Sequence, residues 1–176
     1  MAAPHYLDGA MMNAHQIERL RTVARYIFDT TFAHLYERAP FDEFLDASYG
    51  VGGAMDRDLR DPAIDWCVAA VRDDPIGYAK LTPLRAPVPD AAPGALELQQ
   101  IYVVPDWHGK GVAQDLLDWG VGAARSRGAC TLYLTVFDHN RRAKSFYTRN
   151  GFAEIGRCSF RLGDRVDDDR IWRKHL

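Results

Sequence analysis

The alternation of apolar and polar residues predicts helices and strands along the whole chain. From position 14 to position 36 the apolar residues recur at helical spacing and define one face of a long helix: Ile17, Leu20, Ala24, Ile27, Phe28, Thr31 and Leu35. Two short helices are expected at 41–50 and 54–61, and the second ends before Pro62. For residues 1–13 the pattern leaves two alternatives, a weak first strand or a disordered segment.

A β-hairpin is expected next. Two β-prone runs between positions 65 and 81 meet at the turn residues Asp73, Asp74 and Pro75. The segment 82–95 contains four prolines and is predicted to be a loop. An interdomain linker is the alternative, but no completed domain precedes this segment, so we favour a surface loop between neighbouring strands.

The strand expected at 96–104 contains a change of phase. Leu96 and Leu98 are apolar on even positions, whereas Ile101 and Val103 are apolar on odd positions. A shift by one residue is what a β-bulge produces, because one residue is left out of the ladder and the strand bends. A strand that is buried on both faces is the alternative.

Two glycines stand where this strand gives way to a helix. Pro105 ends the strand, a helix is expected from Gly109 onwards, and Gly128 is a plausible left-handed C-cap. Gly109 and Gly111 fit either a tight connection or an anion site, because a helix N-terminus presents unsatisfied N–H groups and a partial positive charge. A dinucleotide fingerprint and a P-loop both fit the spacing worse.

The remaining pattern completes a single α/β domain over residues 1–176. A strand is expected at 130–138 and a helix at 139–151, with Asn140 as its N-cap and Gly151 as its stop. Ala143, Phe146 and Tyr147 share one face of that helix. Two further strands are expected between positions 153 and 176.

Composition and charge exclude several classes of protein. The chain is 47% hydrophobic with a formal net charge of −2, so it lacks the basic footprint of a nucleic-acid binder. No apolar run approaches the roughly 20 residues of a membrane span. The start of the chain has no secretion signal and the three cysteines are widely spaced, so we expect a cytoplasmic protein with free thiols and no metal.

Three stretches in this order carry a resemblance to a known family: "IYVVPDWHGKGVAQDLL", "LYLTVFDHN" and "AKSFYTRNGF". They resemble the acyl-CoA-binding core of the GNAT superfamily of N-acetyltransferases, and the resemblance covers residues 14–176. The family's loop pattern is [QR]-x-x-G-x-[GA], and His108 stands here where Gln or Arg is usual. "TFAHLY", "LELQQIYV" and "SFRLGD" are similar to the PaiA-type polyamine N-acetyltransferases, which act on spermidine and spermine.

The resemblance implies a fold and a co-substrate. The fold would be a central, mixed and mostly antiparallel sheet flanked by helices, with a bulged strand splayed from its neighbour. The co-substrate would be acetyl-CoA, its pantetheine arm paired with the main chain of Ile101 and Val103 and its pyrophosphate on the N–H groups from Gly109 to Gln114. The full set of implied coenzyme residues is Ile101, Tyr102, Val103, His108, Gly109, Lys110, Gly111, Val112, Ala113, Gln114, Asn140 and Tyr147.

The same resemblance suggests catalytic roles. Tyr147 is the candidate general acid for the departing thiolate, and the alternative is that its ring only packs beside Phe146. Glu97 is the candidate general base, and the alternative is a solvated carboxylate at a strand edge. Thr135 occupies the position where some relatives carry a strand glutamate.

Other groups of charged residues are candidates for ligand binding. Asp42, Glu43 and Asp46 follow the long first helix, where relatives contact the acceptor, and would hold a polycation. A basic group near the proposed coenzyme site fits either its 3′-phosphate or a solvated helix face: Arg141, Arg142, Lys144 and Arg149.

The predicted activity is therefore transfer of an acetyl group to a primary amine of a small molecule, with a polyamine as the favoured acceptor. A peptide N-terminus or an amino-acid derivative is the alternative acceptor. A non-catalytic acyl-CoA sensor is the alternative class, and Tyr147 favours the enzyme because a sensor needs no acid beside the sulfur. The oligomeric state, a homodimer included, is left open.

Overall fold

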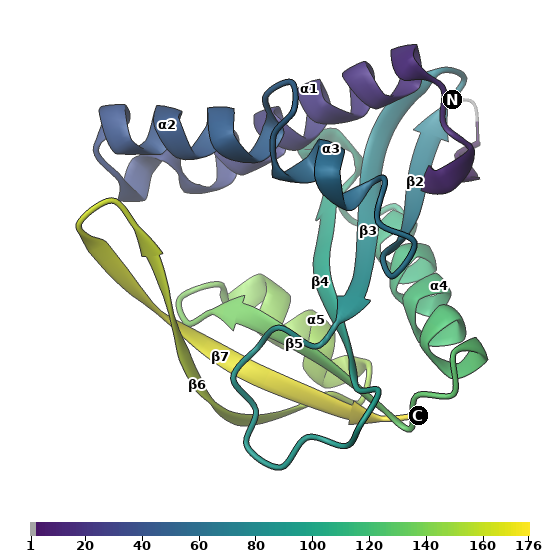
Figure 1. The fold of residues 1–176 in the computed structure, drawn as a ribbon, viewed down its shortest axis with the longest axis vertical. Coiled ribbons are helices and arrows are strands. Elements are labelled where there is room, and N and C mark those ends of the chain that lie inside the picture. Colours follow the sequence, from purple (N-terminus) through teal and green to yellow (C-terminus); the bar gives the residue numbers. More distant parts are fainter. Residues whose placement is uncertain (1–2) are drawn as a thin grey trace.

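Seven strands form one sheet with helices on both of its faces in the computed structural model, which describes residues 3–176 (Figure 1). The strands and α-helices are β1 (His5–Asp8), α1 (Ala14–Phe32), α2 (Arg38–Tyr49), α3 (Ala54–Asp58), β2 (Asp65–Val71), β3 (Asp74–Pro83), β4 (Leu96–Val103), α4 (Val112–Ser126), β5 (Thr131–Phe137), α5 (Arg141–Arg149), β6 (Ala153–Leu162) and β7 (Arg165–His175). The proline-rich segment is a loop between β3 and β4, as predicted.

The sheet splits at its centre. Its strand order is β1-β2-β3-β4-β5-β7-β6, and β4 with β5 is the parallel pair among otherwise antiparallel neighbours. These two strands pair only where Leu96 meets Leu132 and Glu97 meets Tyr133. Beyond that point they diverge, and Figure 1 shows β5 and β7 turning away from β4. The rest of β4 therefore has a free edge that faces an opening in the sheet.

The predicted β-bulge is confirmed. Lys80 of β3 pairs with Gln100 and the next residue, Leu81, pairs with Leu98, so Gln99 is left out of the ladder. Leu98 and Val103 consequently belong to the same hydrophobic cluster although one position is even and the other odd. The bend that accompanies a bulge lies at the start of the splayed part of β4.

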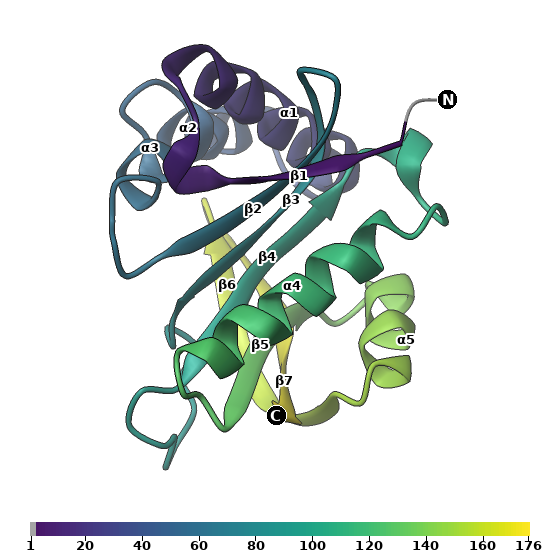
Figure 2. The ribbon, with the colours of Figure 1, turned by 90° about the vertical axis from the view of Figure 1, so that its right-hand side faces the viewer.

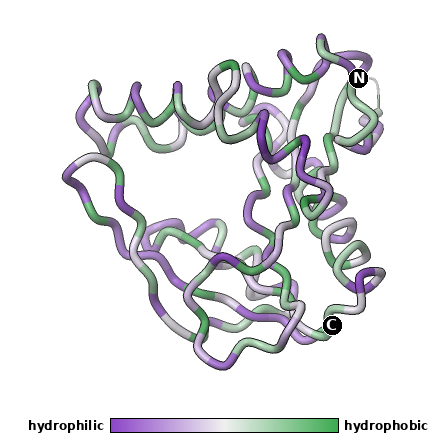
Figure 3. The backbone as a smooth tube through the Cα atoms, in the orientation of Figure 1, coloured by the Kyte–Doolittle hydropathy of each residue, from purple (hydrophilic) through white to green (hydrophobic). Residues whose placement is uncertain are grey.

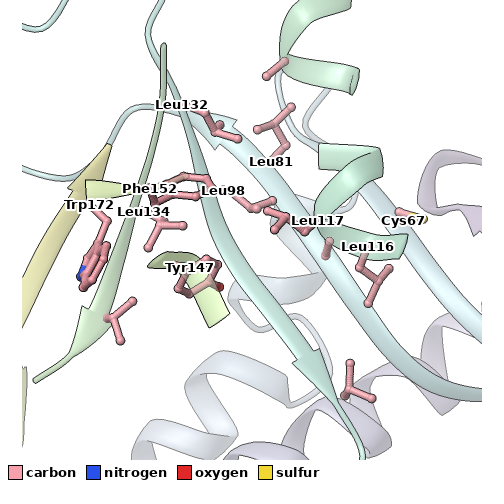
Figure 4. Close-up of a cluster of buried hydrophobic side chains, with 14 of the residues drawn as sticks. Cys67, Leu81, Leu98, Leu116, Leu117, Leu132, Leu134, Tyr147, Phe152 and Trp172 are labelled. Atoms are coloured by element: carbon pink, nitrogen blue, oxygen red, sulfur yellow. The ribbon is translucent and has the colours of Figure 1, made fainter. Parts of the chain in front are cut away.

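Each face of the sheet has its own hydrophobic core. α4 and α5 cover one face and α1, α2 and α3 the other (Figure 2). Figure 4 shows the first core, in which Leu117 of α4 approaches Leu98 of the sheet. The second core packs α1 and α2 over β2, β3 and β4. Purple and green alternate along the tube of α1 and α2 in Figure 3, as expected for helices with one apolar face.

At the N-terminus the structure has the strand alternative, and two helix boundaries farther along the chain differ from the sequence-based expectation. A first strand, β1, forms at the sheet edge by pairing with β2, and residues 1 and 2 lie outside the described part of the chain. α1 ends at Phe32 and continues as a 3-10 turn, so Leu35 is not in its α-helical face. α4 begins at Val112 rather than at Gly109. Both Gly109 and Gly111 have a positive φ, which is incompatible with a right-handed helix at these two positions.

Candidate active site

The free edge of β4 presents main-chain groups to the opening in the sheet. The N–H of Val104 donates to the carbonyl of Ile76, which lies directly opposite, at 2.9 Å. In an antiparallel ladder such hydrogen-bonded pairs alternate with non-bonded ones. The N–H and C=O groups of Ile101 and Val103 therefore point away from β3 and into the gap. An extended chain can pair with them there as an additional strand does.

A cavity of about 540 Å³ lies over this edge, between β4, the loop before α4, and α5. Ten of the twelve residues that the sequence assigned to the coenzyme line it: Ile101, Tyr102, Val103, His108, Gly109, Gly111, Ala113, Gln114, Asn140 and Tyr147. The other two do not. Val112 is buried in the core, and the ammonium of Lys110 lies 5.0 Å from the ring centre of Trp107.

The start of α4 is shaped as an anion cradle. Gly109 and Gly111 have φ of +73° and +88°, and a Cβ added to either would meet nothing within 4 Å, so open space lies above both. The N–H groups of Gly111, Val112 and Ala113 have no acceptor among the described residues. The expected set of anion-binding N–H groups, which ran to Gln114, ends one residue earlier. The N–H of Gln114 already donates to the carbonyl of Gly111 at 2.8 Å. The residues at this helix start thus fit a bound pyrophosphate.

His108 has a partner that the sequence did not indicate. Its Nε2 lies 2.8 Å from the carbonyl oxygen of Val103, so we assign the ring proton to Nε2. One guanidinium nitrogen of Arg142, from α5, lies 2.6 Å from Nδ1 of the same ring. The imidazole therefore joins the end of β4 to α5, and it holds a guanidinium in the cavity where the family pattern would have placed Gln or Arg.

Tyr147 both packs against neighbouring rings and lines the first cavity. Its ring contacts the rings of Phe146 and Phe152, with centroids 5.2 and 5.5 Å apart. The residue also lines the large cavity, and burial raises the pKa of its phenol above the ordinary range. Asn140 lines the cavity too, and its side-chain oxygen accepts the N–H of Ala143 at 3.1 Å, which confirms it as the N-cap of α5.

A second cavity, of about 310 Å³, adjoins the first. Phe32 and Tyr102 line both cavities and form the wall between them. The walls of the second cavity are largely aromatic: Phe28, Phe32, Tyr36, Phe44, Tyr49, Tyr102, Phe137 and Phe160. Three carboxylates, those of Glu97, Asp167 and Asp169, also line it. An aromatic cavity with several carboxylates is suited to a small cation.

Glu97 has a structural task that the sequence did not indicate. It is only 3% exposed, so the alternative of a solvated carboxylate is wrong. Its Oε2 accepts the N–H groups of Arg85 and Ala86 at 2.9 and 2.8 Å. The side chain thereby holds the proline-rich loop against β4, and it lines the second cavity at the same time.

The expectation for Asp42, Glu43 and Asp46 is corrected. None of the three lines either cavity: Asp42 accepts a hydrogen bond from Arg38 at 2.9 Å, and Asp46 forms an ion pair with Arg25. The reason is helical periodicity. Phe44, Ser48 and Tyr49 form the face of α2 that lines the second cavity, which turns the three acids outwards.

Two of the three acids that line the second cavity come from β7. Asp167 and Asp169 are two residues apart on one strand and so project from the same face of the sheet. Three consecutive aspartates, 167–169, hide this alternation in the sequence, and only the pairing of β7 with β5 and β6 fixes which of them point inwards.

The chain belongs to the acetyltransferase (GNAT) family, whose model matches residues 23–152, and it has the GNAT fold. It is 35% identical over 81 residues to an uncharacterised N-acetyltransferase of Mycobacterium bovis. That match spans 46% of this chain and about half, 52%, of the relative. It is 26% identical over 157 residues, 88% of each chain, to an uncharacterised N-acetyltransferase from the pepI 3′ region of Lactobacillus delbrueckii subsp. lactis.

A solved structure shares the whole fold. The crystal structure of the PaiA N-acetyltransferase from Thermoplasma acidophilum, in complex with coenzyme A, matches with a TM-score of 0.74 over 99% of each chain at 20% identity. GNAT acetyltransferases use acetyl-CoA as the acetyl donor. Within residues 3–176, no helix is long and apolar enough to cross a membrane, and no group of His, Cys, Asp or Glu side chains could hold a metal ion.

Proposed function

We propose that this protein transfers the acetyl group of acetyl-CoA to a primary amine of a small cationic molecule, and that a polyamine is its acceptor. The observation that carries the proposal is the pair of adjoining cavities. One has the main-chain edge and helix start that fit a coenzyme, and the other has aromatic walls and carboxylates. The PaiA-type resemblance of the sequence points to the same class of acceptor.

On the donor side, the chain supplies binding and one proton. The main chain of Ile101 and Val103 holds the pantetheine arm, and the N–H groups at the start of α4 hold the pyrophosphate. Tyr147 donates a proton to the sulfur as the C–S bond breaks. Its place in the donor cavity and the raised pKa of its phenol support this role, because the phenol keeps its proton at every ordinary pH.

On the acceptor side, the chain supplies negative charge and aromatic surface. A protonated amine is attracted both by the carboxylates and by the faces of the rings. The volume of about 310 Å³ is at the lower end of the range of small-molecule sites. A polyamine carries several ammonium groups on a thin aliphatic chain, which suits a narrow cavity of this composition.

The test measures turnover of acetyl-CoA with a panel of amines. Release of the free CoA thiol is the readout. The panel contains spermidine, spermine, a neutral amino-acid derivative and a peptide with a free N-terminus. We expect spermidine or spermine to have the highest kcat/KM. The KM for spermidine should rise with salt, because ions screen the attraction between the approaching polycation and the negatively charged cavity. Coenzyme binding without turnover of any amine would favour the sensor, and preference for the neutral derivative would refute the polyamine assignment.

The outward acids of α2 provide a matched control. Replacing Asp42, Glu43 and Asp46 by their amides removes three negative charges close to the acceptor cavity but none that lines it. The KM for spermidine should stay within about twofold of the wild-type value, since surface ion pairs contribute little. A large increase in KM would place the acceptor on α2 after all.

A further inference from the structure

The three carboxylates of the acceptor cavity differ in what they already bind. Asp167 accepts the hydroxyl of Tyr36 and the Nε–H of Arg165, the latter at 2.7 Å. Glu97 accepts the two N–H groups of the proline-rich loop. Among the described residues, Asp169 has no hydrogen-bond donor and no ion pair to its carboxylate, although it lines the same cavity. It is therefore the carboxylate that is left for a ligand.

Asp169 also lies at the end of the acceptor cavity that borders the donor cavity. On β7 it pairs with Phe137, the last residue of β5. The ring of Phe137 contacts the ring of Phe32 edge-on, with centroids 6.5 Å apart, and Phe32 lines both cavities. Three residues after Phe137 the chain reaches Asn140, which lines the donor cavity. An amine bound at Asp169 is thus close to the common wall of the two cavities.

The surroundings of this carboxylate favour either the protonated, neutral form of Asp169 or the binding of a cation beside it. Burial, together with the negative charges of Asp167 and Asp168, raises the pKa of Asp169 to about 6. Titratable groups face it from every neighbouring element: Asp167 with its Arg165 on β7, Cys158 on β6, Tyr36 after α1, Tyr49 on α2, and Glu97 and Tyr102 on β4. The one cation among these groups, Arg165, is bound to Asp167. A ligand ammonium would supply the missing positive charge.

We propose that Asp169 binds the ammonium group of the acceptor and takes the proton that the amine must lose before it attacks. This inference rests on the proposed function and names its general base. One N–H bond of the ammonium breaks and its proton passes to the carboxylate, which becomes neutral. The amine lone pair then forms the new C–N bond while the C–S bond breaks and Tyr147 donates its proton to the departing sulfur. A second proton leaves the nitrogen and restores the phenol of Tyr147. The acetylated amine and the CoA thiol leave, and Asp169 releases the proton to water.

The test compares Asp169→Asn with Asp168→Asn. Both replacements remove one negative charge from neighbouring positions of β7, but Asp168 is exposed and lies 3.6 Å from Arg170 in an ion pair. We expect Asp169→Asn to lower kcat/KM for spermidine by about 10²-fold or more, within the range of general-base contributions. Asp168→Asn should change it by less than about threefold. CoA affinity, measured by calorimetry, should be the same in both variants.

The pH dependence separates a proton acceptor from a structural residue. In the wild type, kcat/KM should rise with pH through about 6, where Asp169 loses its proton, and then reach a plateau. In Asp169→Asn the rise near 6 should vanish. Activity should instead increase up to the pKa of the free amine, about 10 for an alkylammonium, because the variant acts only on neutral amine.

Thermal stability provides a second readout. Because the folded-state pKa of Asp169 is raised, its ionised form is disfavoured in the fold above pH 6, and removing that charge should leave stability at pH 8 equal or higher. Lower stability together with lost activity would mean a structural role. An unchanged pH profile in active Asp169→Asn would overturn the inference alone, whereas absence of turnover by the wild type with every amine would overturn the proposed function as well.

Discussion

The two glycines that bracket α4 allow backbone strain and coenzyme binding to be separated. Gly111, before the first turn, has φ of +88°, and Gly128, after the last turn, has φ of +80°. A Cβ added at either position meets no atom within 4 Å. Gly111→Ala and Gly128→Ala therefore force the same left-handed conformation on an L-residue at the two ends of one helix. Only the first places its methyl group in the donor cavity.

The structure gives a magnitude for each effect. An L-residue in the left-handed region costs roughly 1–2 kcal/mol, which for a chain of this size lowers Tm by several degrees in both variants. Binding should differ. The methyl of Gly111→Ala occupies the approach to N–H groups whose charge-assisted hydrogen bonds contribute about 1.5–3 kcal/mol each, so CoA affinity should fall roughly tenfold to a hundredfold. Gly128→Ala should bind CoA as the wild type does.

The assays are thermal unfolding and calorimetric titration with CoA, performed on both variants and the wild type. Equal losses of Tm with a loss of affinity confined to Gly111→Ala would support the cradle. If folded Gly111→Ala binds CoA with unchanged affinity, the glycine serves the turn alone and the anion lies elsewhere. If Gly128→Ala also loses affinity, strain in α4 rather than the added methyl accounts for the effect.

Three further outcomes follow from single contacts. Arg142→Ala should weaken CoA binding by about tenfold or more and reduce the salt dependence of binding. Arg141→Ala removes the same charge outside the cavity and should do neither. Equal effects of the two changes would refute a specific role for the guanidinium bound to His108. Tyr147→Phe should lower kcat at least tenfold without changing CoA affinity or Tm, and full activity in this variant would withdraw the acid role. Gly122→Ala, in an exposed turn of α4, should raise the free energy of unfolding by up to about 1 kcal/mol in a denaturant titration.

The donor half of the site was predictable because its determinants are local in sequence. The change of phase between Leu98 and Ile101 indicated a bulge, which the pairing of β3 with β4 confirms. The glycines before α4 and the N-cap at Asn140 likewise act through residues a few positions away. Such features leave a mark on the hydrophobic pattern and on turn chemistry, which a single sequence displays directly.

The acceptor half was not predictable because its determinants are distant pairings. Which aspartate of 167–169 points inwards depends on the register of β7 against β5, whose partner residues are about 30 positions earlier. The outward direction of the acids on α2 is the exception, because helical periodicity places them away from the face that buries Phe41 and Leu45. The contact between His108 and Arg142 joins the loop before α4 to the first turn of α5, 34 residues apart, and has no local pattern at all.

The two proposed proton-transfer groups should be distinguishable in one pH profile, because burial raises both pKa values with opposite consequences. For Asp169 the raised pKa brings ionisation of the carboxyl to about pH 6, close to neutral. For Tyr147 the rise removes ionisation from that range, so the phenol is always a donor and never limits the alkaline side. Tyr147→Phe should therefore lower the plateau of kcat/KM without moving the rise near pH 6, and Asp169→Asn should remove that rise. A shifted rise in Tyr147→Phe would mean that the phenol, rather than the carboxylate, is coupled to the proton of the acceptor.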